Sequence, residues 1–284
     1  MLVSEPPASD QRITATHMVT TEGGIAATSS IAFQSLGAKA GLVTVVGGDS
    51  NGEALQKSLL AQRFSYLRVY KIEKEKTSVS TIQVERDGKR CITRYGGCAD
   101  ALDFSDMEKE VFHHARFVHI GGVGDSLMLE AAKYCKNQTR AVVSVDGGNL
   151  SRALTDQILR YCDIFIPDDK TACKTLNMDP KTACEYYYQK GPGIVCVTMG
   201  PNGAIAYDGS SFIRQPAYEV EVVDTTGAGD NFHGAFLYAL AQGWTLEKVL
   251  CFSCVFSSIT CCGLGGREAI PSLEQVQSAM RTIE

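Results

Sequence analysis

The residues with the clearest chemical potential lie in one short segment, Asp224–Asp230, which reads DTTGAGD. It follows the strand-like run EVEVV and precedes the apolar run NFHGAFLYALAQ, which is typical of a helix. Glycines let the backbone approach a ligand closely, and the first turn of a helix offers free N–H groups and the positive end of its dipole. The segment therefore predicts a binding site for a phosphate group.

Asp230 falls in the first turn of that helix. Its carboxylate can face the same spot and accept a proton from an attacking hydroxyl. The alternative interpretation is that Asp230 is only a favourable acid at a helix N-terminus and that the glycines only form a tight turn. Taken alone, these seven residues favour neither interpretation.

The elements around this segment indicate an α/β fold. From residue 24 onward, helical stretches alternate with short β-branched runs that end in glycine, proline or an acid, which is typical of a parallel sheet covered by helices. The strand-like runs are AGLVTVVGG, ARFVHIGG, RAVVSVDGG, DIFIP and IVCVTMG. Because ligands of such sheets bind outside the carboxyl ends of the strands, we expect the chemistry at those ends.

Two regions interrupt this rhythm. Residues 11–21 and residues 77–95 alternate polar and apolar positions, and the second region contains Asp87-Gly88, a strong signal for a two-residue hairpin turn. Both regions are predicted to be strands of a small sheet that projects from the main body, as a lid or a dimer surface. Since no low-complexity linker or internal repeat is present, we expect a single domain over residues 1–284.

The overall composition excludes some classes of binding partner and indicates the cellular compartment. The net charge of −5 argues against nucleic acid or an anionic membrane as a main partner, because both favour a basic surface. No run of 18 apolar residues and no signal peptide is present, so neither membrane spanning nor secretion is indicated. The 11 cysteines are odd in number and irregularly spaced, which indicates reduced thiols. We therefore expect a cytoplasmic protein.

Two long motifs resemble the signatures of a known family. DTTGAGDNFHGAF is similar to the C-terminal signature of the ribokinase family, also called the PfkB carbohydrate kinases, and GGIAATSSIAFQSLGAKAGLVTVVGGD resembles its N-terminal signature. They stand in the family's order, about 200 residues apart. Further matches are Asp146, the run VTMGPNG at 197–203 and the run GGREAIP at 265–271. The resemblance covers essentially the whole chain.

The resemblance implies a doubly wound, mostly parallel sheet flanked by helices, with a small β-sheet lid. It also implies ATP as donor, Mg²⁺ and, in many members, a structural monovalent cation such as K⁺. From the projecting strands themselves we expect a homodimer formed through the lid strands. Asp230 resembles the base that deprotonates the acceptor hydroxyl. The amides of Gly227, Ala228 and Gly229 resemble the hole that holds the transferring phosphate.

The remaining site residues are also carried over from the resemblance. Three residues match positions in the family's nucleotide-facing loop, namely Thr198, Gly200 and Gly203. Asp168, in the run FIPDDKTAC, occupies an asparagine-like position of the family, where an acid can hold Mg²⁺ through water. The positions that match the lining of a monovalent cation are Asp224, the carbonyl of Thr226 and Gly265. On physical grounds alone, Asp224 is equally well interpreted as a capping or turn acid.

The acceptor side is less determined. Gly23 and Gly24 resemble the pair whose backbone contacts sugar hydroxyls, although a simple turn before a helix explains them equally well. Thr28 stands where many members carry asparagine, so acceptor recognition is expected to differ from that of ribokinase. Arg12 and Arg94 fall on the predicted lid strands and suit a phosphate or sulfonate on the acceptor, or are solvated lid residues. The motifs GGxAAT, GDxFHGA and GGRxxIP look most like the sulfofructose kinase branch.

One departure from the family lies at the start of the chain. Members usually open with a glycine-ended strand and an aspartate that binds acceptor hydroxyls, and that N-terminal first strand is expected to be missing here. The leading hypothesis is ATP-dependent phosphorylation of a hydroxyl of a ketose, ketose phosphate or sulfosugar. The alternatives are a nucleoside kinase and a catalytically weak nucleotide-binding or regulatory protein.

Overall fold

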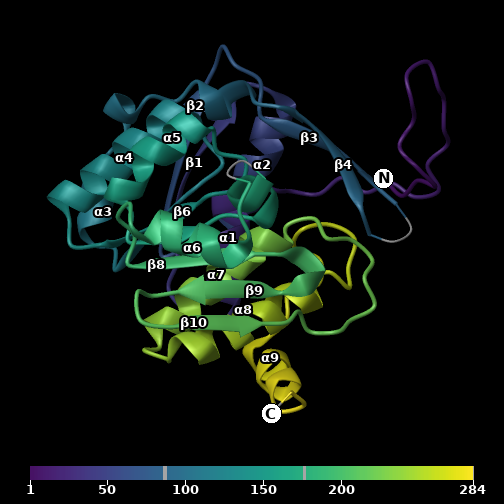
Figure 1. Cartoon of the computed structure of the whole chain (residues 1–284). Coiled ribbons are helices and arrows are strands. Elements are labelled where there is room, and N and C mark those ends of the chain that lie inside the picture. The colour runs from purple at the N-terminus through teal and green to yellow at the C-terminus, as the bar shows by residue number, and fades with distance from the viewer. Residues whose placement is uncertain (86–87, 175–176, 284) are drawn as a thin grey trace. The chain divides into compact units, whose positions relative to one another are not determined.

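The chain forms two compact units in the computed structural model, which describes residues 1–85, 88–174 and 177–283 (Figure 1). The first unit comprises Met1–Ala101, Tyr218–Ala235 and Val255–Glu284. The second comprises Leu102–Ala217 and Phe236–Cys254. Two helices, α7 (Ala228–Ala241) and α8 (Leu246–Thr260), contribute residues to both units.

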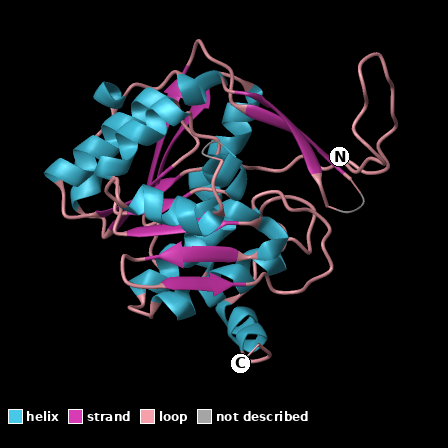
Figure 2. Ribbon diagram, viewed as in Figure 1, coloured by secondary structure: helices cyan, strands magenta, loops and turns pink. Residues whose placement is uncertain are grey.

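A six-stranded sheet organises the second unit, with the strand order β10-β9-β8-β7-β6-β5 (Figure 2). Strands β5 to β8 are parallel, whereas β9 and β10 are antiparallel to their neighbours. The strands span Phe117–Ile120 (β5), Val142–Asp146 (β6), Ile164–Ile166 (β7), Ile194–Thr198 (β8), Ala204–Tyr207 (β9) and Phe212–Gln215 (β10). The predicted mostly parallel sheet is thereby confirmed.

The helices of the second unit cover this sheet and bury its apolar strands. Helix α4 packs against β5 and β6, and α6 packs against β8 and β9. Phe165 of β7 is fully buried at the centre, where the ring of Tyr187 from α6 meets it edge-on. The helical segments are η2 (Phe104–Asp106), α3 (Glu110–His113), α4 (Asp125–Gln138), α5 (Arg152–Ile158), η3 (Leu159–Tyr161), the π-helix η4 (Lys170–Lys174), α6 (Pro180–Tyr188) and η5 (Gly200–Asn202).

The first unit contains a separate two-stranded parallel sheet, β1 (Gly41–Gly47) and β2 (Tyr66–Ile72). Helices α1 (Ile25–Ser35) and α2 (Ser50–Ala61) pack on it, with Ala27, Leu42 and Leu59 at the centre of their contact. The short η1 (Gly97–Asp100) and α9 (Leu273–Met280) complete the unit. Helix α9 begins with a capping box between Ser272 and Gln275, which fixes its start by two reciprocal hydrogen bonds.

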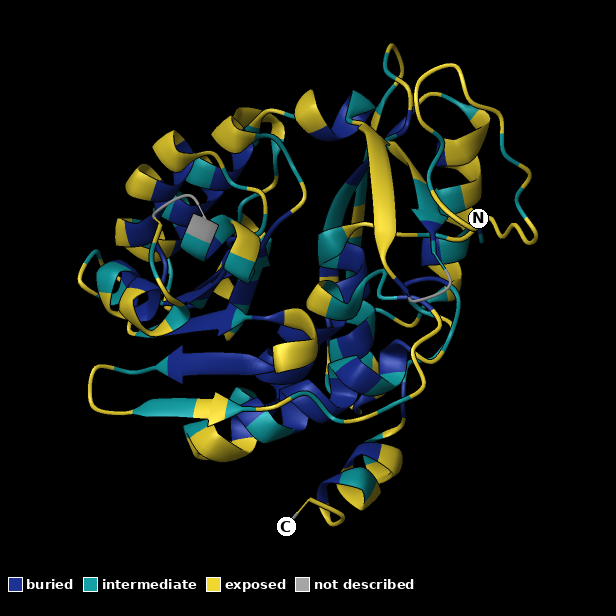
Figure 3. Ribbon diagram, turned by 45° about the vertical axis from the view of Figure 1, so that its right-hand side comes forward, coloured by how far each residue is buried: buried dark blue, intermediate teal, exposed yellow. Residues whose placement is uncertain are grey.

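A small antiparallel pair, β3 (Val79–Val84) and β4 (Arg90–Tyr95), also lies in the first unit. It confirms the strands predicted at 77–95, while Asp87 of the predicted Asp87-Gly88 turn lies outside the described residues. Direct partners share a face of the pair, so Arg90, Ile92 and Arg94 lie on one face, and Val79 and Tyr95 lie on the other. Every residue of β4 is exposed (Figure 3). Its role as a lid stays a prediction.

Two predicted strands are wrong. Residues 11–21 form no strand, and their one ladder contact is an isolated bridge between His17 and Leu2. The neighbours of β3 are instead Met1–Val3, since the Val3 amide donates to the Val84 carbonyl at 3.0 Å. Most of residues 11–21 are exposed, so their alternation of polar and apolar residues does not mark one buried face of a sheet. The run EVEVV also lacks a strand, and its Val223 amide donates to the Cys261 carbonyl after α8.

Two further expectations were the absence of the family's N-terminal first strand and the absence of a membrane-spanning segment. The missing first strand stays a prediction. None of the helices among the described residues combines the length and apolar character needed to cross a bilayer.

Candidate functional site

The glycine-rich loop at the start of α7 is clamped to the tail segment at Gly265-Gly266. Gly227 has a φ of 73°, which favours glycine, and a Cβ added to it would lie 2.8 Å from the Gly266 Cα. The Asn231 side-chain amide donates to the carbonyls of Gly227 at 2.9 Å and Gly266 at 2.8 Å. Because Asn231 is fully buried, this pair of hydrogen bonds fixes where α7 begins.

The amides predicted to hold a phosphate lie at this helix start. Among the described residues, the N–H groups of Gly227 and Gly229 find no hydrogen-bond acceptor, whereas the Ala228 amide donates to the Thr225 carbonyl at 3.3 Å. A Cβ added to Gly229 would meet no atom within 4 Å, so space is open beside it. Asp230 lies in the same turn and is partly exposed. Two donors and a carboxylate thus share one helix end, which suits an anion beside a base.

Asp224 brings together the three residues that were predicted to line a monovalent cation. The residue is 3% exposed, and one carboxylate oxygen accepts from the Thr226 amide at 2.8 Å and the Thr226 hydroxyl at 2.6 Å. The other oxygen accepts from the Gly265 amide at 2.9 Å. These contacts are those of a turn acid, and the cation itself stays a prediction.

The predicted acceptor residues cluster at the start of α1. Gly24 has a φ of 98°, and Cβ atoms added to Gly23 or Gly24 would meet nothing within 4 Å, so their backbone borders open space. Thr28 differs from the expectation, because it is 1% exposed and its hydroxyl accepts a hydrogen bond from the Arg267 Nε at 3.1 Å. Helix α7 approaches α1 closely at Gly234, where an added Cβ would lie 2.4 Å from the Ser29 carbonyl oxygen.

Arg267 and Glu22 complete this cluster, and the sequence interpretation missed both. The Arg267 Nη2 donates to the Gly23 carbonyl at 2.7 Å, and its Nη1 lies 3.5 Å from a carboxylate oxygen of Glu22. The same oxygen of Glu22 accepts from the Ser58 hydroxyl at 2.5 Å. Burial lowers the pKa of Arg267, and the charges of Glu22 and Asp230 partly offset that effect. The available signal was a charge directly beside each glycine pair, in EGG and GGR.

The β3–β4 pair contacts the glycine-rich loop. The Thr225 hydroxyl donates to the Gly88 carbonyl at 3.1 Å, and the Arg90 guanidinium donates to the Thr225 carbonyl. Arg94, a predicted acceptor residue, lies on the same face of the pair as Arg90 and forms an ion pair with Asp100 at 3.2 Å. The described contacts therefore bring Arg90, rather than Arg94, to the loop.

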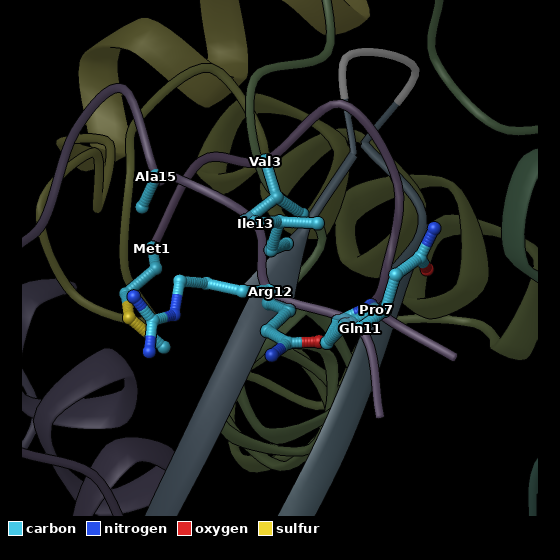
Figure 4. Close-up of a pocket in the computed structure, with 8 residues that line it drawn as sticks. Met1, Val3, Pro7, Gln11, Arg12, Ile13 and Ala15 are labelled. Atoms are coloured by element: carbon cyan, nitrogen blue, oxygen red, sulfur yellow. The ribbon is translucent and has the colours of Figure 1, made fainter. Parts of the chain in front are cut away.

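Arg12, the other predicted acceptor arginine, lies elsewhere in the first unit. In Figure 4 its side chain extends toward Met1, in a pocket of about 350 Å³. No described contact joins Arg12 to Gly23, Thr28 or Asp230. The pocket is lined by Met1, Val3, Pro7, Gln11, Arg12, Ile13, Ala15 and Gln83.

The predicted nucleotide-facing residues form a tight loop in the second unit. Thr198 ends β8, and its amide donates to the Pro167 carbonyl at 3.0 Å. Gly200 and Gly203 both have positive φ, of 54° and 80°, and connect β8 to β9. A Cβ added to Gly203 would lie 1.9 Å from the Gln215 carbonyl oxygen, whereas one on Gly200 would meet nothing within 4 Å. Gly203 is thus required by packing, and Gly200 borders open space.

Asp168, the predicted Mg²⁺ residue, lies at the same sheet edge as Asp146. One Asp168 carboxylate oxygen accepts from the Thr171 amide at 2.6 Å. A Cβ added to Gly148 would lie 3.0 Å from an Asp146 oxygen and 3.9 Å from an Asp168 oxygen, so the two carboxylates converge. No three acidic, histidine or cysteine side chains of the described residues form a closed metal site. Two carboxylates suit Mg²⁺, which keeps several waters and phosphate oxygens as ligands.

Comparison with known proteins places these observations in a family. The ribokinase of Lactococcus lactis is 25% identical over 92% of this chain and 86% of its own length. The nucleoside kinase of Methanothermobacter thermautotrophicus is 25% identical over 88% of this chain and 81% of its own. A solved structure of Arabidopsis thaliana ribokinase complexed with ribose and ATP superposes with a TM-score of 0.82 at 22% identity, covering 99% and 94% of the two chains. The model of the pfkB family carbohydrate kinases matches residues 2–273, and the chain belongs to that family.

Proposed function

We propose that this chain transfers the γ-phosphoryl group of ATP to a hydroxyl of a sugar or sugar derivative, with Asp230 as the base. The observation that carries the proposal is the start of α7, where the Asp230 carboxylate shares a helix turn with the amides of Gly227 and Gly229, which have no acceptor among the described residues. The amides suit the charge that develops on the transferring phosphoryl group, and the carboxylate suits the proton that leaves the acceptor.

In this proposal the loop between β8 and β9 binds the nucleotide. Thr198, Gly200 and Gly203 form the nucleotide-facing loop, and the solved Arabidopsis ribokinase, which is complexed with ribose and ATP, supports ATP as donor. Asp168, with Asp146 beside it, would hold Mg²⁺ through water, and the ion when bound would neutralise charge on the nucleotide phosphates.

A monovalent cation such as K⁺ belongs to the proposal at Asp224, Thr226 and Gly265. An ionised carboxylate offers about four lone-pair positions, and three donors already use the Asp224 side chain, so one position remains for a cation. Activity in KCl would then exceed activity in the same concentration of tetramethylammonium chloride.

The acceptor side is proposed to be the open backbone at Gly23 and Gly24. A ketose, ketose phosphate or sulfosugar stays the leading acceptor class, with the sulfofructose kinase branch as the finer proposal. Because Arg94 is bound to Asp100 and Arg12 lies in a separate pocket, an anionic group on the acceptor would need Arg94 to exchange partners.

The test is ADP production across neutral sugars, sugar phosphates, sulfosugars and nucleosides, for the wild-type chain and for Asp230→Asn. Loss of a general base is expected to reduce kcat by about 10²- to 10⁴-fold. ATP affinity, measured by calorimetry, is expected to stay within about twofold, since Asp230 acts on the acceptor. An unimpaired rate in Asp230→Asn would remove it as the base.

The same screen separates the alternatives. The nucleoside kinase relative makes nucleosides the second candidate acceptor class, and turnover of nucleosides alone would support it. Binding of ATP without turnover of any acceptor, in any ionic condition, would support a nucleotide-binding or regulatory protein instead.

We also propose a homodimer through the β3–β4 pair. Val79 and Tyr95 share one face of this pair and are 44% and 54% exposed, which leaves an apolar surface available to a second copy. Tyr95→Glu is expected to shift the molar mass measured by light scattering toward the monomer, whereas Ile92→Glu, at an exposed position on the opposite face, is the control and should leave the mass unchanged.

A further inference from the structure

Arg267 is a buried guanidinium that joins the tail of the chain to the start of α1. Its side chain is 10% exposed, and it donates to the Thr28 hydroxyl at 3.1 Å and to the Gly23 carbonyl at 2.7 Å. A buried charge is costly unless it is paired and hydrogen-bonded. Arg267 is both paired and hydrogen-bonded, so the surrounding structure favours arginine at this position over other residues.

Two carboxylates balance the charge of Arg267. Glu22 lies 3.5 Å from the guanidinium. The turn that carries Asp230 lies against the segment that carries Arg267, because the Asn231 side chain donates to the Gly266 carbonyl at 2.8 Å, and the charge of Asp230 favours the protonated guanidinium. The titratable and charged groups on the surrounding segments are Glu22 before α1, Asp230 and His233 on α7, Asp224 and Arg90 at the glycine-rich loop, and Glu268 next to Arg267. Asp224 is engaged by Thr226 and Gly265, and Arg90 by the Thr225 carbonyl, so neither replaces Arg267 beside Asp230.

Thr28 is not placed to contact the sugar substrate directly, because it is 1% exposed and its hydroxyl oxygen already accepts a hydrogen bond from Arg267. The Arg267 guanidinium contacts both the Gly23 carbonyl and the Thr28 hydroxyl, and its charge interacts with that of Asp230. Arginine suits this task, since its planar fork offers several donors in fixed directions, whereas lysine offers a point charge.

We propose that Arg267 is a positioning residue of the phosphoryl-transfer site, which fixes Gly23 and Thr28 on the acceptor side and places a permanent positive charge beside Asp230. The proposal rests on the function proposed above. Its two parts are separable, because the hydrogen bonds orient the acceptor-side backbone and the charge keeps the Asp230 carboxylate ionised.

Two substitutions separate the parts. Arg267→Lys keeps the charge and loses the fork, and Arg267→Gln loses the charge. With the acceptor that the screen finds to be phosphorylated fastest, both are expected to raise the acceptor KM by about tenfold, the effect of one lost hydrogen bond to a charged group, while the ATP KM stays within about twofold. In Arg267→Gln alone, the acid limb of the kcat/KM profile should move up by about one pH unit. Thr28→Val, which keeps the charge, is the matched control and should leave that limb in place.

A readout without turnover tests the charge directly. Protein labelled with ¹³C at aspartate carboxyls, with the Asp230 signal assigned by Asp230→Asn, gives the titration of Asp230. That titration should move to higher pH in Arg267→Gln, stay in place in Arg267→Lys, and move to lower pH in Glu22→Gln, which removes the competing carboxylate.

Unchanged titration of Asp230 in both Arg267→Gln and Glu22→Gln would overturn the proposal, as would equal increases in the KM values for ATP and acceptor. If Arg267→Gln does not fold, the Asp230 titration in Glu22→Gln and the acceptor KM of Arg267→Lys still decide it. Absence of turnover by the wild-type chain with every acceptor would refute the proposed function instead, and the Asp230 titration would still decide whether Arg267 acts on that carboxyl.

Discussion

The Gly265 amide donates a hydrogen bond of 2.9 Å to the Asp224 carboxylate, and so joins two segments 41 residues apart in the chain. The other oxygen of Asp224 holds Thr226, two residues along the glycine-rich loop. Gly227 and Gly266 then approach so closely that a side chain on Gly227 would collide with the Gly266 backbone. The loop that carries Asp230 is therefore shaped by the tail of the chain as much as by its own sequence.

Replacing Asp224 with asparagine should destabilise the first unit. Asparagine keeps one acceptor oxygen but turns an N–H donor toward either the Gly265 amide or the Thr226 amide, and so leaves a buried donor unsatisfied. We expect the free energy of unfolding in urea to fall by about 1–3 kcal/mol. Asp208→Asn is the matched control, because Asp208 also accepts from two following amides but lies in an exposed turn. Equal losses in the two variants would contradict a special role for Asp224.

Alanine at Gly227 and at Gly229 should have opposite effects on stability. At Gly227 the φ of 73° and the Gly266 Cα at 2.8 Å penalise a Cβ, and we expect a loss of about 1–3 kcal/mol. At Gly229, inside α7 with no atom within 4 Å of the added Cβ, alanine should gain up to about 1 kcal/mol from its higher helix propensity. Thermal unfolding of the pair measures both. A loss at Gly229 as large as that at Gly227 would show that the close approach to Gly266 is not the cause.

Valine at Thr225 should release the β3–β4 pair from the glycine-rich loop. The substitution removes the hydroxyl that donates to the Gly88 carbonyl at 3.1 Å and keeps the shape of the side chain. Loss of about 1 kcal/mol of local stability corresponds to roughly fivefold faster amide exchange. Hydrogen exchange measured by mass spectrometry on peptides that cover β3 and β4 should show this increase. Thr93→Val, in the exposed β4, is the control. If that variant accelerated exchange in the same peptides equally, the hydrogen bond from Thr225 to Gly88 would not be what holds the pair to the loop.

Much of the fold could be predicted because its signals are local. The apolar runs of β5 to β8 end in glycine, proline or an acid, and the structure places all four strands where the sequence predicts them. The strand predicted at 11–21 failed, since alternation of polar and apolar residues does not reveal whether a partner surface exists. The run EVEVV was predicted to be a strand, but the amide of its Val223 donates to the carbonyl of Cys261, which is distant in sequence and could not be foreseen.

The candidate site divides in the same way. Gly227, Gly229 and Asp230 could be found because glycine and an acid at a helix start form one contiguous pattern. Arg267 could not, because its role depends on Gly23 and Thr28, more than 200 positions earlier in the chain. Its hydrogen bond to Thr28 also explains why a threonine stands at a position that was expected to meet the acceptor.

Asp49, the residue before α2, should stabilise the folded chain by an amount that decreases at acid pH. Asp49 accepts from the Thr77 hydroxyl at 2.5 Å and from the Gly52 amide at 3.0 Å, and the Thr77 hydroxyl is the largest cause that lowers its pKa. Because the folded-state pKa lies below the unfolded value of about 3.9, the stabilisation is present above that pH and is lost as the pH falls through the folded-state pKa. The difference in free energy of unfolding between the wild-type chain and Asp49→Asn should therefore shrink in urea titrations taken from about pH 5 to about pH 3. In Thr77→Val, where the amide bonds alone remain, the stability should fall less steeply over the same range. A difference that stays constant down to the lowest pH would show that Asp49 stabilises α2 equally well when protonated.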